Sequence, residues 1–458
     1  MAEVLRKANP NWRQHIPDHK TGCKVRLKFR LREKSRKMRE ALGITKKPKA
    51  QEHIQPKFEL YSYQIMAAKY HLEHRYSLNC SEMGTGKSAM ALEAARLSRK
   101  KVAVFGPAFL ERTWVHEAFR MGVEIVYYSY SSLYKHPIDT LKGFDFWIAD
   151  ECHYLKSPGA KRTEAFFDRF VATKPKYFVG LTGTPIKNRV PDFWTLLYMC
   201  SKCPEDTNGH RLSGKIKSYY GFSEYFCHFT ETFIYGNRVR KFVGIKEDKI
   251  VDLKSILRGK FIKFKVEDVL GDLPSITRKH VDLGMAPTKG MLKAFQEYEK
   301  GPKADIKAKA TSALLKAPKT ASYCLDIIAE GAVPILIFTD HIESAKALKS
   351  SITNSALCTG AVPAEERMQM VSDFQAGKYD AIIATIGSLS VGVTLTAARH
   401  VVFNDISWSG SDNQQAEKRI HRIGQKLPCF AHYIHGSQTD VHIYALVKEK
   451  QETVEKVL

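Results

Sequence analysis

The sequence lacks any long hydrophobic run. No stretch of about 18 uncharged apolar residues, the length that a membrane-spanning helix needs, occurs in the 458 residues. Residues 1–15 also lack the apolar core of a secretory signal peptide. We therefore expect a protein that has no membrane partner, is not secreted and works in the cytoplasm.

Cysteine is present, but without the spacing of a disulfide framework. The nine cysteines lie mostly in apolar or motif-like segments, so we expect reduced thiols. One pair, Cys200 and Cys203, has the CxxC spacing of zinc ligands. Further candidate ligands downstream are His210, Cys227 and His228. Because Cys200 continues an apolar run, a core thiol is the simpler interpretation, and zinc is the alternative.

Acidic residues are too few to balance the basic ones. The chain has 72 Lys and Arg against 48 Asp and Glu, a net charge of +24. This excess predicts a nucleic-acid partner, because phosphate backbones attract Lys and Arg through counterion release. Residues 1–50 hold 16 basic and 4 acidic residues, +12, or half of the total. Within them, residues 24–32 alternate basic and apolar side chains, which predicts a strand with one cationic face or, alternatively, a disordered basic arm.

From about residue 57, short apolar runs alternate with longer amphipathic stretches. Continuous apolar runs separated by helical segments favour parallel sheets that are covered on both faces. The expected strands are Ser77–Cys80, Val102–Phe105, Phe144–Ala149, Tyr177–Leu181, Val333–Phe338, Tyr379–Ala384, Val401–Phe403 and Ala431–Ile434. The sequence therefore predicts an α/β fold with two parallel-sheet lobes.

Residues 200–280 break this alternation. They are rich in Lys, Tyr and Phe, and we interpret them as a mostly helical insertion between the lobes. The expected organisation is a basic N-terminal DNA-binding element (1–56), a first, ATP-binding lobe (57–200), a helical insertion (201–285) and a second lobe (286–458).

A glycine-rich loop, Ser81-Glu-Met-Gly-Thr-Gly-Lys-Ser88, follows the first expected strand and precedes a helical pattern. Backbone N–H groups of such a loop, together with the helix N-terminus, can wrap phosphates. Lys87 would contact the β- and γ-phosphates of ATP, and Ser88 would place its hydroxyl on Mg²⁺. The remaining expected nucleotide contacts in the loop are Met83, Gly84, Thr85 and Gly86. Ser81 stands where this pattern usually has its first glycine.

An acidic motif, Asp150-Glu-Cys-His153, ends the strand that begins at Phe144. Asp150 would hold the Mg²⁺, which leaves Glu151 to orient and deprotonate the attacking water. By itself the pair could be a helix cap, but the phosphate loop about 60 residues earlier favours catalysis. Small hydroxyl residues in Gly180-Leu-Thr-Gly-Thr-Pro-Ile-Lys-Asn188 could hydrogen-bond to the acidic motif and relay the state of the γ-phosphate.

Two arginines lie near the C-terminus, in Gln414-Gln-Ala-Glu-Lys-Arg-Ile-His-Arg-Ile-Gly-Gln425. Arg419 and Arg422 are three residues apart, so a helix would place both guanidinium groups on one face. Contributed by the second lobe, they could neutralise the charge that develops on a transferred phosphoryl group. The alternative is a solvated basic helix.

In this order, the four motifs resemble those of superfamily II helicases, and their details are similar to the Swi/Snf-type group over residues 58–445. The resemblance implies two RecA-like lobes, with Gln64 contacting the adenine. It also implies that Gly106–Trp114 belongs to a strand-gripping motif and that Thr385–Thr396 couples DNA to the nucleotide. Ser390 stands where many members have glycine, which is closer to the fork-remodelling, annealing branch.

These expectations together indicate an ATP- and Mg²⁺-dependent DNA helicase or translocase that remodels forks and four-way junctions. Phage-encoded branch-migration helicases are similarly compact, and such an origin would place the chain in the host cytoplasm. The alternatives are a duplex translocase that displaces bound proteins without separating strands, an RNA helicase, and a nucleic-acid-binding protein with a silent ATPase. No nuclease motif is visible, so we expect no cutting activity.

Overall fold

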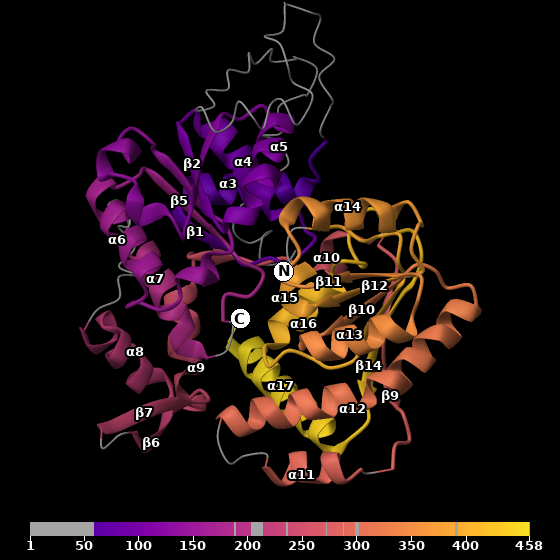
Figure 1. The fold of residues 1–458 in the computed structure, drawn as a ribbon. Coiled ribbons are helices and arrows are strands. Elements are labelled where there is room, and N and C mark those ends of the chain that lie inside the picture. The colour runs from indigo at the N-terminus through magenta and orange to yellow at the C-terminus, as the bar shows by residue number, and fades with distance from the viewer. Residues whose placement is uncertain are drawn as a thin grey trace, which may run out of the picture.

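The computed structural model describes residues 59–457, except for residues 187–188, 203–213, 235–236, 272, 287, 298–301 and 390–392. Within these residues, two six-stranded parallel sheets form two lobes that lie side by side (Figure 1). The predicted α/β class with two parallel-sheet lobes is therefore confirmed. The basic N-terminal element predicted for residues 1–56 lies outside the described residues.

The first lobe is built on the sheet order β3-β2-β4-β5-β1-β8. Its strands are β1 (Tyr76–Asn79), β2 (Val102–Gly106), β3 (Ile125–Ser129), β4 (Phe146–Ala149), β5 (Tyr177–Leu181) and β8 (Phe261–Ile262). Its helices are α3 (Ser62–Glu73), α4 (Lys87–Ser98), α5 (Glu111–Arg120), α6 (Lys161–Thr173) and α7 (Trp194–Cys200). The parallel pairing brings the carboxyl ends of β1, β4 and β5 to one edge, where three of the predicted motifs begin.

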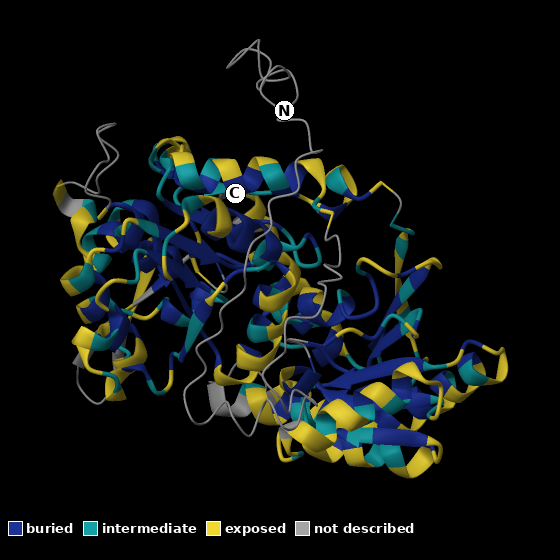
Figure 2. Ribbon diagram, turned by 90° about the horizontal axis from the view of Figure 1, so that it is seen from above, coloured by how far each residue is buried: buried dark blue, intermediate teal, exposed yellow. Residues whose placement is uncertain are grey.

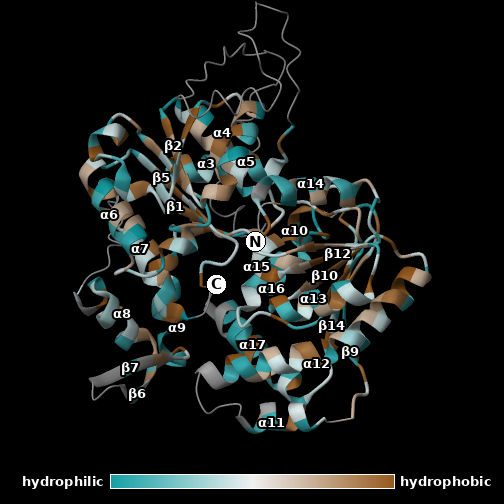
Figure 3. Ribbon diagram, in the orientation of Figure 1, coloured by the Kyte–Doolittle hydropathy of each residue, from teal (hydrophilic) through white to brown (hydrophobic). Residues whose placement is uncertain are grey.

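Both faces of this sheet are buried. Along β2, Val102 and Val104 pack into one apolar cluster, and Ala103 and Phe105 pack into another on the opposite face. Figure 2 shows the sheets of both lobes as buried, with exposed residues on the outer helices, and Figure 3 shows the strands as largely hydrophobic. The continuous apolar runs in the sequence follow from this double coverage.

The second lobe has the sheet order β11-β12-β10-β13-β14-β9. Its strands are β9 (Ile276–Asp282), β10 (Ile335–Thr339), β11 (Ser355–Cys358), β12 (Ala381–Thr385), β13 (His400–Phe403) and β14 (Cys429–His435). Its helices are α11 (Lys289–Glu297), α12 (Pro302–Ala329), α13 (Ile342–Ser351), α14 (Ala364–Gln375), α15 (Ile386–Leu389), α16 (Gly410–Glu417) and α17 (Gln438–Val457). None of the described helices is long and apolar enough to cross a membrane.

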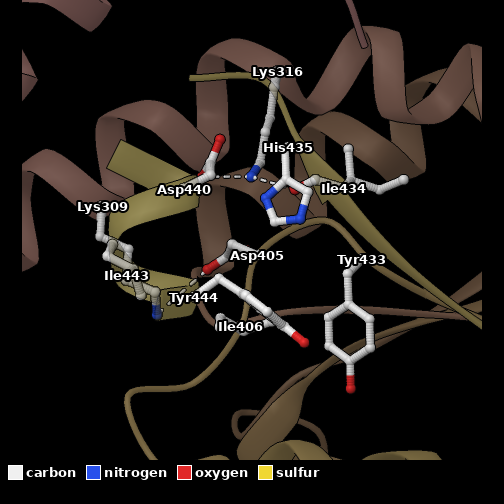
Figure 4. Close-up of a pocket in the computed structure, with 10 residues that line it drawn as sticks. All are labelled: Lys309, Lys316, Asp405, Ile406, Tyr433, Ile434, His435, Asp440, Ile443 and Tyr444. Carbon is white, nitrogen blue, oxygen red and sulfur yellow. Dashed lines mark hydrogen bonds and ion pairs between the residues drawn. The ribbon is translucent and has the colours of Figure 1, made fainter. Parts of the chain in front are cut away.

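A buried ion pair joins α12 to α17. The ammonium group of Lys316, which is 0% exposed, donates hydrogen bonds to Asp440 Oδ1 at 2.6 Å and to the carbonyl oxygen of Ile434 at 3.1 Å. Figure 4 shows this pair beside a small cavity of about 20 Å³, with a second α12 lysine, Lys309, directed toward Asp405. The long helix is therefore fixed to the lobe by charge as well as by apolar packing.

The segment predicted as a mostly helical insertion also contains four strands. Helices α8 (Tyr219–Phe226), α9 (Ile250–Leu257) and α10 (Val266–Val269) are present, and β6 (His228–Ile234) and β7 (Asn237–Val243) form an antiparallel hairpin. Strand β8 extends the first sheet, and β9 pairs with β14 as an edge of the second. The insertion therefore contributes strands to both lobes. Short 3₁₀ helices are Ala108–Leu110, Leu133–Lys135, Ile138–Leu141, Cys152–Leu155, Val190–Phe193, Gly214–Lys217 and Glu247–Lys249.

Candidate nucleotide site between the lobes

The phosphate loop connects β1 to α4, as predicted. Gly84 and Gly86 have φ angles of +86° and +81°, in the left-handed region that favours glycine. Gly86 is the N-cap of α4, so Lys87 and Ser88 begin the helix and its N-terminal N–H groups face the loop. This geometry suits an anion because unpaired N–H groups and the helix dipole act together.

Lys87 folds back on the loop. Its ammonium group donates hydrogen bonds to the carbonyl oxygens of Ser81 at 2.9 Å and Glu82 at 3.2 Å. Burial lowers the pKa of Lys87, whereas the nearby Glu151 and Asp150 act in the opposite direction. The lysine is thus held among the loop carbonyls and close to both acidic residues.

Ser81, the residue in place of a glycine, has a structural contact. Its hydroxyl oxygen accepts a hydrogen bond from the Phe264 N–H at 3.1 Å, just after β8. The side chain of Glu82 accepts one from the Val266 N–H at 3.2 Å. The phosphate loop is therefore tied to the segment that leads from the first lobe to the second.

Gln64 is 3% exposed and lies against the same loop. Its amide nitrogen donates to the Thr85 carbonyl oxygen at 3.1 Å, and its amide oxygen accepts from the Tyr61 N–H at 3.1 Å. The Tyr63 hydroxyl donates to the same Thr85 carbonyl at 2.9 Å. Gln64 is next to the predicted nucleotide site, and its contact with adenine stays a prediction.

Asp150 ends β4, and both of its carboxylate oxygens accept hydrogen bonds. Oδ2 accepts from the indole Nε1 of Trp114 at 2.7 Å, and Oδ1 accepts from the Glu151 N–H at 2.9 Å. Burial and the adjacent Glu151 raise the pKa of Asp150 to about 7, against the effect of the Trp114 hydrogen bond. No sequence pattern predicts the Trp114 contact, because 36 residues separate the partners.

Glu151 adopts a left-handed backbone conformation, with φ of +47°. Its Oε2 lies 3.2 Å from His153 Nδ1, which is also 3.2 Å from the hydroxyl oxygen of Thr182. Burial alone would raise the pKa of Glu151, but His153, Lys87 and Arg419 together hold it below its ordinary value. A carboxylate with a low pKa is ionised at neutral pH, so it can accept a proton.

The predicted contact between the hydroxyl motif and the acidic motif is present, through Thr182 and His153. Gly183 brings the hydroxyl motif against the phosphate loop: a Cβ there would lie 2.9 Å from Met83 Cγ and 3.4 Å from the ammonium nitrogen of Lys87. A larger residue would displace one of these side chains. Three motifs of the first lobe therefore meet at one site.

Arg419 and Arg422 also meet at this site, but not on a helix. Helix α16 ends at Glu417, so the prediction that a helix carries both arginines is wrong. The chain turns instead, and both guanidinium groups donate to one acceptor, the Val393 carbonyl oxygen, at 3.0 and 3.1 Å. Burial and neighbouring Arg422 lower the pKa of Arg419 to about 9, which still leaves it protonated at neutral pH.

The arginine turn of the second lobe packs on the phosphate loop of the first. A Cβ on Gly84 would lie 3.5 Å from the Cβ of Arg422. The ammonium group of Lys418 lies 3.7 Å from the Glu82 carboxylate, across the lobes. All five predicted catalytic residues therefore border one site, which both lobes build.

The zinc alternative gains no support from the described residues. Cys200 is 1% exposed within the core of the first lobe, as the simpler interpretation expected, whereas Cys203 and His210 lie outside the described residues. The described chain has one cluster of three candidate metal ligands, formed by Asp340, His341 and Asp405. The buried ammonium group of Lys309 pairs with both aspartates of this cluster. Ser390 also lies outside the described residues.

Two protein-family models match consecutive parts of the chain. Residues 98–313 match the SNF2-related domain, and residues 320–424 match the helicase conserved C-terminal domain. The chain belongs to the Swi/Snf-type group of superfamily II helicases. It carries the helicase-like ATPase domains of that group, which bind nucleotide.

Two curated relatives are similar to most of this chain. The mouse (Mus musculus) DNA annealing helicase and endonuclease ZRANB3 is 25% identical over 337 residues, 69% of this chain. The Drosophila melanogaster SWI/SNF-related matrix-associated actin-dependent regulator of chromatin subfamily A-like protein 1 is 26% identical over 424 residues, 82% of this chain. The matches span 30% and 53% of these relatives' own lengths.

Among solved structures, the chain is similar to the Sulfolobus solfataricus SWI2/SNF2 ATPase core in complex with dsDNA. The match covers 89% of this chain and 98% of that one, at 17% identity and a TM-score of 0.40.

Proposed function

We propose that this chain is an ATP-dependent DNA motor that remodels branched DNA such as forks and four-way junctions. The observation that carries the proposal is the composite site, in which Arg422 of the second lobe packs over Gly84 of the phosphate loop. A site built from two lobes can change the distance between them as the nucleotide is bound and hydrolysed. If each lobe grips the DNA backbone, that change becomes movement along a strand.

Each catalytic residue has one role in this proposal. Lys87 exchanges its loop carbonyl partners for the β- and γ-phosphates. Glu151, which is ionised at neutral pH, orients a water molecule and takes its proton. Arg419 and Arg422 neutralise the charge that develops on the transferred phosphoryl group.

Ser88 and Asp150 would hold a Mg²⁺ ion. A hydroxyl and a carboxylate are oxygen ligands of the kind that Mg²⁺ prefers, and each oxygen of Asp150 keeps a free lone-pair site after accepting one hydrogen bond. When bound, the ion would neutralise charge on the β- and γ-phosphate oxygens. The residues present therefore fit the ion.

We propose DNA as the nucleic acid along which the motor moves, because of the net charge of this chain and the name of a relative. The net charge of +24 favours a phosphate backbone, and one relative is named a DNA annealing helicase. A duplex translocase that displaces bound proteins and an RNA helicase are the alternatives. The cysteines of the sequence lack the spacing of a disulfide framework, which fits a reducing compartment, so we propose the cytoplasm, or the host cytoplasm for a phage protein.

A gel assay on three substrates tests the proposal. The protein is incubated with ATP and a mobile four-way junction, a fork, or a linear duplex that carries a bound protein. We expect ATP-dependent products from the junction and the fork, and none with Lys87→Ala. Displacement of the bound protein with no change to the junction or fork would instead indicate a duplex translocase. Matching RNA substrates distinguish the RNA helicase.

A further inference from the structure

Trp114 contacts the proposed metal-holding residue but has no part in the mechanism above. It lies on α5, is 2% exposed and donates its indole N–H to Asp150 Oδ2 at 2.7 Å. The other carboxylate oxygen of Asp150 accepts from the Glu151 N–H at 2.9 Å. The carboxylate is thus oriented by two donors, the backbone N–H of the next residue and the side chain of a helix that is distant in sequence.

The orientation of a metal-binding carboxylate depends on such partners. Groups that hydrogen-bond to a metal ligand fix its geometry, and their loss commonly lowers metal affinity by about 10- to 100-fold. An indole N–H can only donate, so it holds one carboxylate oxygen in one direction. We infer that Trp114 is a positioning residue that sets the carboxylate of Asp150 for Mg²⁺. The inference rests on the proposed function.

The helix that carries Trp114 also borders the second lobe. Arg112 of α5 donates to the carboxylate of Glu365 on α14 at 3.2 Å. Glu117, three residues after Trp114, lies near enough to Arg422 to oppose the lowering of the Arg422 pKa by burial. Trp114 therefore links Asp150 to a first-lobe helix that also contacts the second lobe.

A binding measurement that needs no DNA and no turnover tests this inference. Calorimetry measures the affinity for a non-hydrolysable ATP analogue with Mg²⁺ and with EDTA. In Trp114→Phe we expect the affinity in EDTA to stay within about twofold of the wild-type value. The gain in affinity that Mg²⁺ provides should fall by about 10-fold.

Trp147→Phe is the matched control. Trp147 lies on β4, is 0% exposed and donates its indole N–H to the Phe144 carbonyl oxygen at 2.9 Å. This variant loses an indole hydrogen bond of the same kind in the same lobe, but one that does not involve Asp150, so its gain in affinity from Mg²⁺ should equal that of the wild type. An unchanged gain in Trp114→Phe, or an equal loss in both variants, would overturn the inference.

Two further results keep the test decisive. If circular dichroism shows that Trp114→Phe is unfolded, the ¹⁵N-labelled indole N–H of Trp114 is followed in the wild type, assigned by replacing the other tryptophans singly. The NMR resonance of this N–H should shift when the Mg²⁺-bound analogue is added and not when the analogue is added alone. The absence of that difference would overturn the inference. A wild type that shows the Mg²⁺ gain but remodels no DNA contradicts only the proposed function.

Discussion

At the scale of single residues, the second lobe contributes two arginines, Arg419 and Arg422, to the candidate nucleotide site. Arg419 is buried and also donates to the Gln415 carbonyl oxygen at 3.1 Å, whereas Arg422 is only partly buried. Both donate to the Val393 carbonyl oxygen. Arg419 is therefore the more firmly held, and Arg422 has more freedom to reach a phosphate over Gly84.

Replacing Arg422 by Ala should lower ATP turnover by about 1,000-fold, because arginines that stabilise a phosphoryl transition state contribute that much or more. Binding of a non-hydrolysable ATP analogue should change far less. Arg422→Lys is not expected to restore turnover, since lysine lacks the planar set of hydrogen-bond donors of a guanidinium group. The measurement is kcat with saturating ATP and DNA.

Lys426→Ala is the control for this variant, because Lys426 is exposed and lies four residues further along the same turn. It should turn over ATP like the wild type. A wild-type kcat in Arg422→Ala would show that Arg422 has no part in catalysis.

At the scale of elements, the sequence predicts the strands whose residues are buried and therefore apolar. Eight strands could be located because their residues are covered on both faces. Strand β9 could not be, because five of its seven residues are exposed and no apolar run marks it. Edge strand β3 is also not predicted, and three of its five residues are only partly buried. Edge strand β11 is not predicted either, although three of its four residues are buried.

The same limit applies to the candidate site. The residue types of the phosphate loop and the acidic motif predicted its chemistry, because each motif is local and follows a strand. The contact of Trp114 with Asp150 and the shared acceptor of the arginines join residues that are 26 to 36 positions apart. Periodicity carries no signal for such contacts, and a helical pattern therefore misplaced the arginines.

The buried pair between α12 and α17 gives a prediction for the second lobe. Asp440→Ala should lower its free energy of unfolding by about 3–5 kcal/mol, because Lys316 would keep a buried charge without its partner. The double change Lys316→Met with Asp440→Leu should cost less, since no charge is left unpaired. Urea denaturation followed by circular dichroism measures both.

Glu343→Ala serves as the comparison, because the pair of Glu343 and Lys346 is 68% and 59% exposed. Exposed pairs contribute about 0–1 kcal/mol, so the urea midpoint should hardly move. If Asp440→Ala were as mild as Glu343→Ala, the buried pair would have no structural role.

For the whole molecule, buried histidines make stability depend on pH. Burial is the main cause that lowers their pKa values, to about 3 for His71 and about 4 for His400 and His432. The pKa is also lowered by burial for the half-buried His341 and His435 and for the buried His421. An unfolded histidine has a pKa of about 6.5, so between pH 6.5 and 4 the unfolded chain binds more protons than the native one. The contribution of these histidines to stability is therefore fully present above pH 6.5 and is lost as the pH falls.

The thermal unfolding midpoint should accordingly drop between pH 7 and pH 5. Each fully buried histidine contributes up to about 1.4 kcal/mol per pH unit in this window. Burial and the adjacent Glu151 raise the pKa of Asp150, which acts in the opposite direction and offsets part of this effect. His432→Phe removes one titrating group, so its midpoint should fall less steeply with pH, whatever its stability at pH 7. A wild-type midpoint that stays constant from pH 7 to pH 5 would show that these histidines titrate alike in both states.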